Sequence, residues 1–124
     1  MTDLSNRVHL FAHVSHRDEL DRLFTEILGL PPAASLDPPG YDEPVLVYRF
    51  TDGASLSVEF TPPSPHESRV SRGAWLELVV DGAVEMKKRV LEAGLPSVPF
   101  DGNDHFYFEA PGGQVFRIID RNQL

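Results

Sequence analysis

The side chains that could do chemistry in this sequence are histidines, acids and aromatics set into short apolar runs. His9, Phe11 and His13 alternate with apolar residues, so they share one face of a predicted strand. Glu59 and Glu77 each interrupt an apolar run. An unpaired carboxylate in a buried strand would be costly. We therefore expect Glu59 to contact a ligand or form an ion pair, and Glu77 to line a pocket or face water.

Aromatic residues accompany these acids. Trp75 shares a strand face with Glu77, and Tyr107 lies in a run predicted to form a neighbouring strand. Together they suit an aromatic and acidic pocket for a cationic or aromatic guest, which would be held by stacking, cation–π contact and ion pairing. Core packing is the alternative for both aromatics, as it is for Tyr48 and Phe11.

Metal chemistry is restricted by composition. The chain has no cysteine, so a metal site would need histidine, carboxylate or carbonyl ligands. Three of the five histidines lie in segments expected at the surface, namely His16, His66 and His105. We expect His9 to hydrogen-bond a carboxylate or a ligand rather than bind a metal, and His13 to lie on the rim of the same face.

The overall charge excludes several partners. The 124 residues carry 11 basic and 19 acidic side chains, for a formal charge of −8 at pH 7. This balance repels a phosphate backbone, so we expect no nucleic-acid partner. No apolar stretch approaches the roughly 20 residues needed to cross a bilayer, and the first residues do not resemble a secretory signal, which predicts a cytoplasmic protein without a membrane partner.

Two segments have the apolar spacing of an amphipathic helix. The first is predicted to start with a capping box at Ser15 and to stop at Gly29. The second runs from about 82 to 93, with Asp81 as its predicted N-cap and Gly94 as its stop. The remaining elements are two strands that precede the helices and two hairpins that follow them: 8–14 and 75–80, then 45–50 with 54–60 and 106–109 with 114–119.

The same order of predicted elements therefore occurs twice along the chain. We predict one domain over 1–124, built from a module at about 6–61, a proline-rich linker at 62–73 and a second module at about 74–120. The second proline-rich stretch, 31–44, is long for a connection and is predicted to hold a short strand or a mobile lid.

In the order and spacing of its motifs, the chain resembles the vicinal oxygen chelate superfamily, which includes glyoxalase I, bleomycin-resistance proteins and extradiol dioxygenases. The motifs that carry the resemblance are HLFAHV at 9–14, LF at 23–24, ILGL at 27–30, VVD at 79–81, LEAG at 91–94 and FEAPGGQ at 108–114. The resemblance implies an α+β fold in which two βαβββ modules form an incompletely closed β-barrel, or cup, with the helices outside.

The resemblance also implies where a metal would be held. The superfamily's four ligand positions correspond to His9, Glu59, Trp75 and Arg117. Only the first two match, because an indole N–H cannot ligate a metal and a guanidinium is permanently positive. We therefore expect no metal, with Arg117 occupying the vacated centre and pairing with Glu59.

The resulting function is expected to be metal-independent small-molecule binding, as in bleomycin-resistance-type members, commonly as a homodimer. Its predicted ligand-binding residues are His9, Phe11, His13, Glu59, Trp75, Glu77, Tyr107 and Arg117. The alternative is an enzyme, a glyoxalase-like lyase or isomerase or an extradiol-type dioxygenase. It would use Zn, Ni, Mn or Fe held by His9 and Glu59, with His13 or Glu77 as further ligands. Metal-free catalysis with Glu59 or His9 as the base is a third possibility.

Overall fold

The computed structural model describes residues 1–62, 64, 73–100, 102 and 104–124. Contacts within the chain group residues 1–66 and 67–124 into two compact units. The division falls inside the predicted 62–73 linker, most of which, with His66, lies outside the described residues.

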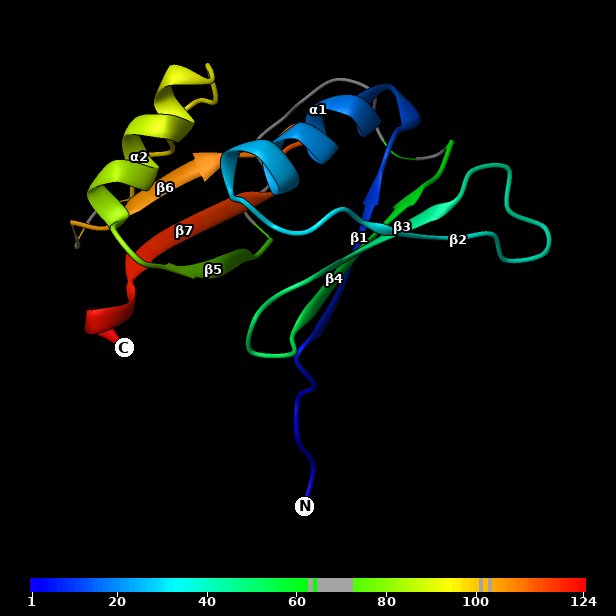
Figure 1. The fold of residues 1–124 in the computed structure, drawn as a ribbon, viewed down its shortest axis with the longest axis horizontal. Coiled ribbons are helices and arrows are strands. Elements are labelled where there is room, and N and C mark those ends of the chain that lie inside the picture. Colours follow the sequence, from blue (N-terminus) through cyan, green and yellow to red (C-terminus); the bar gives the residue numbers. More distant parts are fainter. Residues whose placement is uncertain (63, 65–72, 101, 103) are drawn as a thin grey trace. The chain divides into compact units, whose positions relative to one another are not determined.

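The first unit is a four-stranded sheet with one helical layer (Figure 1). Its order along the sheet is β1-β4-β3-β2, so the last strand in sequence pairs in parallel with β1 and antiparallel with β3. The strand bounds are β1 Arg7–Ala12, β2 Ala34–Leu36, β3 Val45–Arg49 and β4 Ser55–Phe60. The predicted 45–60 hairpin is confirmed, and β2 is a short strand inside the proline-rich 31–44 stretch. The lid role of that stretch stays a prediction.

The helical layer of the first unit covers the apolar face of its sheet. The segment with the predicted apolar spacing forms consecutive helical elements. They are the 3₁₀ turn η1 at Val14–His16, the α-helix α1 at Arg17–Arg22 and the π-helical turn η2 at Leu23–Ile27. The side chains of Leu20, Leu23 and Phe24 are buried. Phe24 packs on Tyr48 with ring centroids 4.7 Å apart, and the Tyr48 hydroxyl donates to Asp21 at 2.7 Å. Burial and this hydrogen bond raise the pKa of Tyr48, so its hydroxyl stays protonated and can donate.

The ends of this helical segment differ in how well the sequence predicted them. Gly29 takes φ +78° and lets the Leu30 N–H bond the Phe24 carbonyl at 2.9 Å, as the predicted stop requires. The capping box at Ser15 is wrong, because strand β1 ends early and His13 Nδ1 accepts the Ser15 N–H at 3.2 Å instead. The surface placement of His16 is also wrong, since the η1 turn directs His16 inward and leaves it 9% exposed.

The second unit has a three-stranded sheet in the order β5-β7-β6. Strand β5 at Trp75–Val80 pairs in parallel with β7 at Val115–Asp120, and β7 pairs antiparallel with β6 at Phe106–Glu109. A single bridge joins Ser97 to Phe108 at the outer side of β6, where the first unit has its fourth strand. The predicted strand at 75–80 and the predicted hairpin are confirmed.

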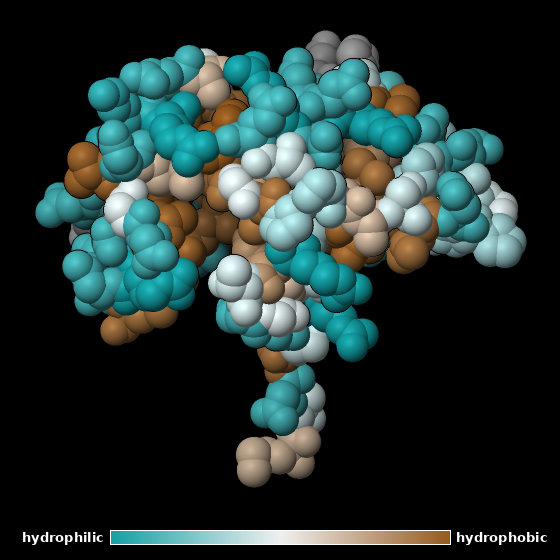
Figure 2. Space-filling view, viewed as in Figure 1, coloured by the Kyte–Doolittle hydropathy of each residue, from teal (hydrophilic) through white to brown (hydrophobic). Residues whose placement is uncertain are grey.

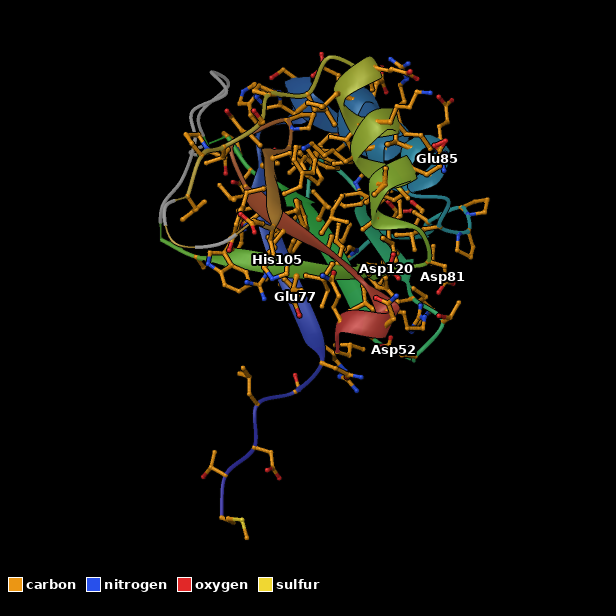
Figure 3. The ribbon with its side chains drawn as sticks, turned by 90° about the vertical axis from the view of Figure 1, so that its left-hand side faces the viewer. Asp52, Glu77, Asp81, Glu85, His105 and Asp120 are labelled. Atoms are coloured by element: carbon orange, nitrogen blue, oxygen red, sulfur yellow. The ribbon has the colours of Figure 1, made fainter. Side chains whose placement is uncertain are left out.

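Helix α2 at Ala83–Glu92 covers one face of this second sheet through Met86 and Val90, both buried. Its outward face is mostly hydrophilic (Figure 2), with Val84 and Leu91 as exposed apolar side chains. The predicted N-cap Asp81 is wrong: Gly82 holds that position with φ +85°, a left-handed conformation that glycine tolerates. The Ala83 N–H is bonded at 3.0 Å by Asp120, which reaches it from the end of β7 (Figure 3). Asp81 is instead 3.0 Å from Arg121, in the turn η3 at Arg121–Gln123.

The architecture is therefore α+β, with two modules in the order strand, helix, strands, as predicted. The barrel-like cup concerns how the two sheets meet and stays a prediction. Among the residues that the structure describes, no helix combines the length and apolar character needed to span a membrane.

The Asp120 cap gives a stability prediction with a defined pH window. Hydrogen bonds from backbone N–H groups, that of Ala83 foremost, lower the pKa of Asp120 below its ordinary value of 3.8. The folded state thus favours the ionised carboxylate, and its contribution to stability is present above that ordinary value and lost as the pH falls through the lower folded-state pKa. We expect Asp120→Ala to lower the free energy of unfolding at pH 7, with the difference from the parent protein shrinking in acid.

Urea denaturation from neutral pH down to about pH 2 measures this difference, with Asp3→Ala as the matched loss of an exposed acid. A deficit that persists unchanged at the acid end, or one shared by Asp3→Ala, would contradict the assignment.

Candidate functional site

Four of the predicted site residues come together on one face of the second sheet. Glu77, Arg117 and Tyr107 lie side by side across β5, β7 and β6, because Arg117 is in register with both of the others. Trp75 is two residues before Glu77 on the same strand and therefore points to the same side. Glu77 projects from β5 on the side away from α2 (Figure 3). Strand register alone thus assembles this cluster, which we call the Trp75–Arg117 cluster.

The Arg117 guanidinium is the centre of the cluster. Its Nε donates to Oε2 of Glu77 at 2.8 Å, and Nη2 donates to the same oxygen. Its Nη1 donates to the Tyr107 hydroxyl at 3.3 Å. The guanidinium carbon lies 4.5 Å from the centroid of the Trp75 ring, within cation–π range. Three neighbours on three sides therefore fix its position.

Electrostatics keep this group charged. The hydrogen bond to Tyr107, followed by the one to Glu77, raises the pKa of Arg117 above its ordinary value. A guanidinium is already protonated throughout the accessible pH range, so the cluster holds a permanent positive charge. Glu77 balances that charge locally.

Exposure separates the roles of the two aromatics. Tyr107 is buried at 3% exposure, and its ring packs on Phe100 with centroids 4.2 Å apart. Trp75 is 41% exposed and meets Tyr107 edge-on at 5.8 Å. Tyr107 therefore supports Arg117 and Trp75 from a buried position, whereas the indole of Trp75 is partly exposed. The sequence reasoning did not single out Phe100, although its alternation with Val98 is a weak strand-like signal.

The first unit brings together a second group of predicted residues. His9 Nε2 lies 2.9 Å from Oε1 of Glu59, as expected of a histidine bonded to a carboxylate. The His9 and Phe11 rings meet edge-on at 5.1 Å, and Phe11 is 65% exposed. His13 is not part of this group, because β1 ends before it and its Nδ1 bonds Ser15 instead. The predicted shared face of the three residues therefore holds only for His9 and Phe11.

The predicted ion pair between Arg117 and Glu59 is replaced by two local pairs. Arg117 bonds Glu77, which stands opposite it on the adjacent strand, and Glu59 bonds His9, from the strand beside its own. Glu77 bonds its register partner, whereas Glu59 bonds a residue diagonal to it, because Phe11 stands in register with Glu59. Each carboxylate therefore has a partner on an adjacent strand.

The four residues that the resemblance assigned to metal-ligand positions, His9, Glu59, Trp75 and Arg117, do not fit a metal. Of these four, only His9 and Glu59 carry metal-binding atoms, and they are hydrogen-bonded to each other. Trp75 offers no lone pair, and Arg117 holds a fixed positive charge. Within the described part of the chain, no three histidine or acidic side chains gather to hold an ion.

Solved structures with this fold cover nearly the whole chain. The trypanothione-dependent glyoxalase I of Leishmania major superposes with a TM-score of 0.78 at 11% identity, over 98% of this chain and 89% of that chain. The fosfomycin resistance protein FosX from Mesorhizobium loti gives 0.71 at 12% identity, over 95% and 90%. TnmS3, an antibiotic binding protein from Streptomyces sp. CB03234, gives 0.63 at 20% identity, over 97% and 98%.

No protein-family sequence profile matches the chain, and no curated protein is detectably similar to it in sequence. At these identities the likeness establishes the fold. The chain thus has the vicinal oxygen chelate fold that its motifs predicted.

The Glu77–Arg117 pair should contribute measurably to stability, since both side chains are partly shielded from water. We expect Glu77→Ala to lower the free energy of unfolding by about 1 kcal/mol, because Arg117 loses its main acceptor. The matched control is Asp81→Ala, which removes the acid of the Asp81–Arg121 pair, where the side chains are 82% and 53% exposed. That variant should change stability little. Urea denaturation distinguishes the two, and equal losses would mean that the Arg117 pair has no special weight.

Proposed function

We propose that this chain binds an aromatic small molecule without a metal, using the Trp75–Arg117 cluster as its contact surface. The observation that carries the proposal is the fixed Arg117 guanidinium over the indole of Trp75. It gives a rigid, partly exposed aromatic platform at a position where superfamily enzymes would place a metal ligand. Rigid aromatic surfaces bind flat guests at little cost in conformational entropy.

The electrostatic repulsion between Arg117 and a metal ion supports the metal-independent part of the proposal. Two unit charges about 4 Å apart at an effective dielectric near 20 interact by roughly 4 kcal/mol. A dication beside Arg117 would therefore be disfavoured by roughly 8 kcal/mol. Glu77 cancels part of this repulsion, but its Oε2 is already occupied by two N–H groups of Arg117.

The same pairing favours an aromatic guest over a cationic one. The sequence predicted that Glu77 could attract a positive guest. Because Glu77 is neutralised by Arg117, its charge is available only if that pair breaks. The exposed indole of Trp75 carries no such penalty, so stacking is the interaction that the cluster offers most readily.

The similarity to TnmS3 adds support from a different direction. That protein is described as an antibiotic binding protein, and the match spans almost all of both chains. We propose the same class of activity here, capture of a small molecule without turnover, and we propose a homodimer as the working form. Light scattering coupled to size-exclusion chromatography measures the mass, and a monomer at every concentration would remove the dimer proposal.

Trp75 is the only tryptophan in the chain, so intrinsic fluorescence reports directly on the proposed surface. We expect at least one planar polycyclic aromatic compound in a ligand panel to quench this fluorescence saturably. Calorimetry should show that Trp75→Ala weakens the same ligand by about tenfold, the equivalent of one aromatic stacking interaction. Val84→Ala, at an exposed position on α2, is the control and should bind as the parent does. If no compound in the panel quenches the fluorescence, the proposal is wrong.

Elemental analysis of untagged protein purified without chelators separates binding from metal chemistry. Substoichiometric metal is expected. Stoichiometric Zn, Ni, Mn or Fe would instead support the metal-dependent lyase, isomerase or dioxygenase.

A further inference from the structure

Two arginines of the first unit lack the partners that the others have. Arg17, Arg22, Arg117 and Arg121 each lie within 3.3 Å of a carboxylate oxygen, and Arg89 also has an interaction partner. Arg7 and Arg49 have no such partner among the described residues. In a chain with 19 acids against 11 basic residues, two unpaired arginines need an explanation.

The same two arginines are neighbours in the sheet. Arg7 on β1 and Arg49 on β3 are both in register with Ser55 on the strand between them. Residues in register point to the same side, so the two guanidinium groups flank the Ser55 hydroxyl on one face. Two strand spacings separate their α-carbons by about 10 Å, which two long side chains can span from both sides. Both side chains are exposed.

The surroundings do not neutralise this pair. The nearest acid in sequence, Asp52 in the β3–β4 turn (Figure 3), accepts the Ala54 N–H at 3.0 Å and forms no ion pair with Arg7 or Arg49. The next row of the same face holds His9 and Ser57, and Glu59 beyond them is bonded to His9. The row of Arg7, Ser55 and Arg49 is therefore a local positive spot on an acidic protein.

We propose that Arg7, Ser55 and Arg49 form a binding site for the phosphate or phosphonate group of a small molecule. Two guanidinium groups and a hydroxyl offer donors from three directions, which matches the three oxygens of such a group. Its charge of nearly −2 matches two arginines, whereas a carboxylate brings one charge and two oxygens. The proposal is independent of the Trp75–Arg117 cluster and of the aromatic guest.

The test is a titration of the ¹⁵N-labelled protein with inorganic phosphate and with propylphosphonate at constant ionic strength, followed by arginine Nε–H signals and by calorimetry. We expect two Nε–H signals to shift saturably, one absent in Arg7→Gln and the other in Arg49→Gln. The double variant should lose at least about tenfold in affinity. Arg22→Gln makes the same charge change on an arginine already paired with Glu26 and should bind as the parent does.

Tighter binding of propylphosphonate than of phosphate would assign the site to a small molecule carrying the group, whereas equal binding would assign it to the free ion and overturn the small-molecule part. Shifts without saturation, or an equal loss in Arg22→Gln, would overturn the whole site. Trp75 fluorescence follows the proposed aromatic guest separately, so either idea can fail alone.

Discussion

The permanent charge of one guanidinium constrains the chemistry of the second unit. Arg117 lies on the central strand of that sheet, with an acid on one side and a buried tyrosine on the other. A positive group there must be held by neighbours, because its partial burial would otherwise be costly. Glu77 and Tyr107 meet that need, and the exposed indole of Trp75 completes the arrangement. The result is a partly exposed indole held beside a paired, permanently charged guanidinium.

The two modules solve the same electrostatic problem differently. In the first, a carboxylate pairs with the imidazole of a histidine. In the second, a carboxylate pairs with an arginine that stays charged. Both acids stand on the more exposed face of their strands, and each takes its partner from an adjacent strand.

Periodicity predicted most of the fold because the relevant physics is local. The 75–80 strand, both hairpins and the glycine stops follow from alternation, helical spacing and left-handed glycines, and all are confirmed. The errors occur where a distant residue takes over a local role. Asp120 rather than Asp81 caps α2, and nothing in the sequence near residue 83 indicates a partner 37 positions away. For the candidate site, residue types predicted which side chains gather in the Trp75–Arg117 cluster. The partner of Arg117 depended on strand register, which a single sequence does not reveal.

In each sheet the first strand pairs in parallel with the last strand in sequence, and this has a consequence for biosynthesis. Among the described strands, β1 pairs with β4 alone, so the ribosome must extend the chain through Phe60 before β1 can join the first sheet. Until then the nascent segment carries an unpaired edge with apolar side chains, a state prone to aggregation. Once residue 60 has emerged, however, the sheet has all four strands without anything from the later half. The two sheets can therefore form one after the other during translation. Each is complete once its last strand in sequence, β4 or β7, has been synthesised.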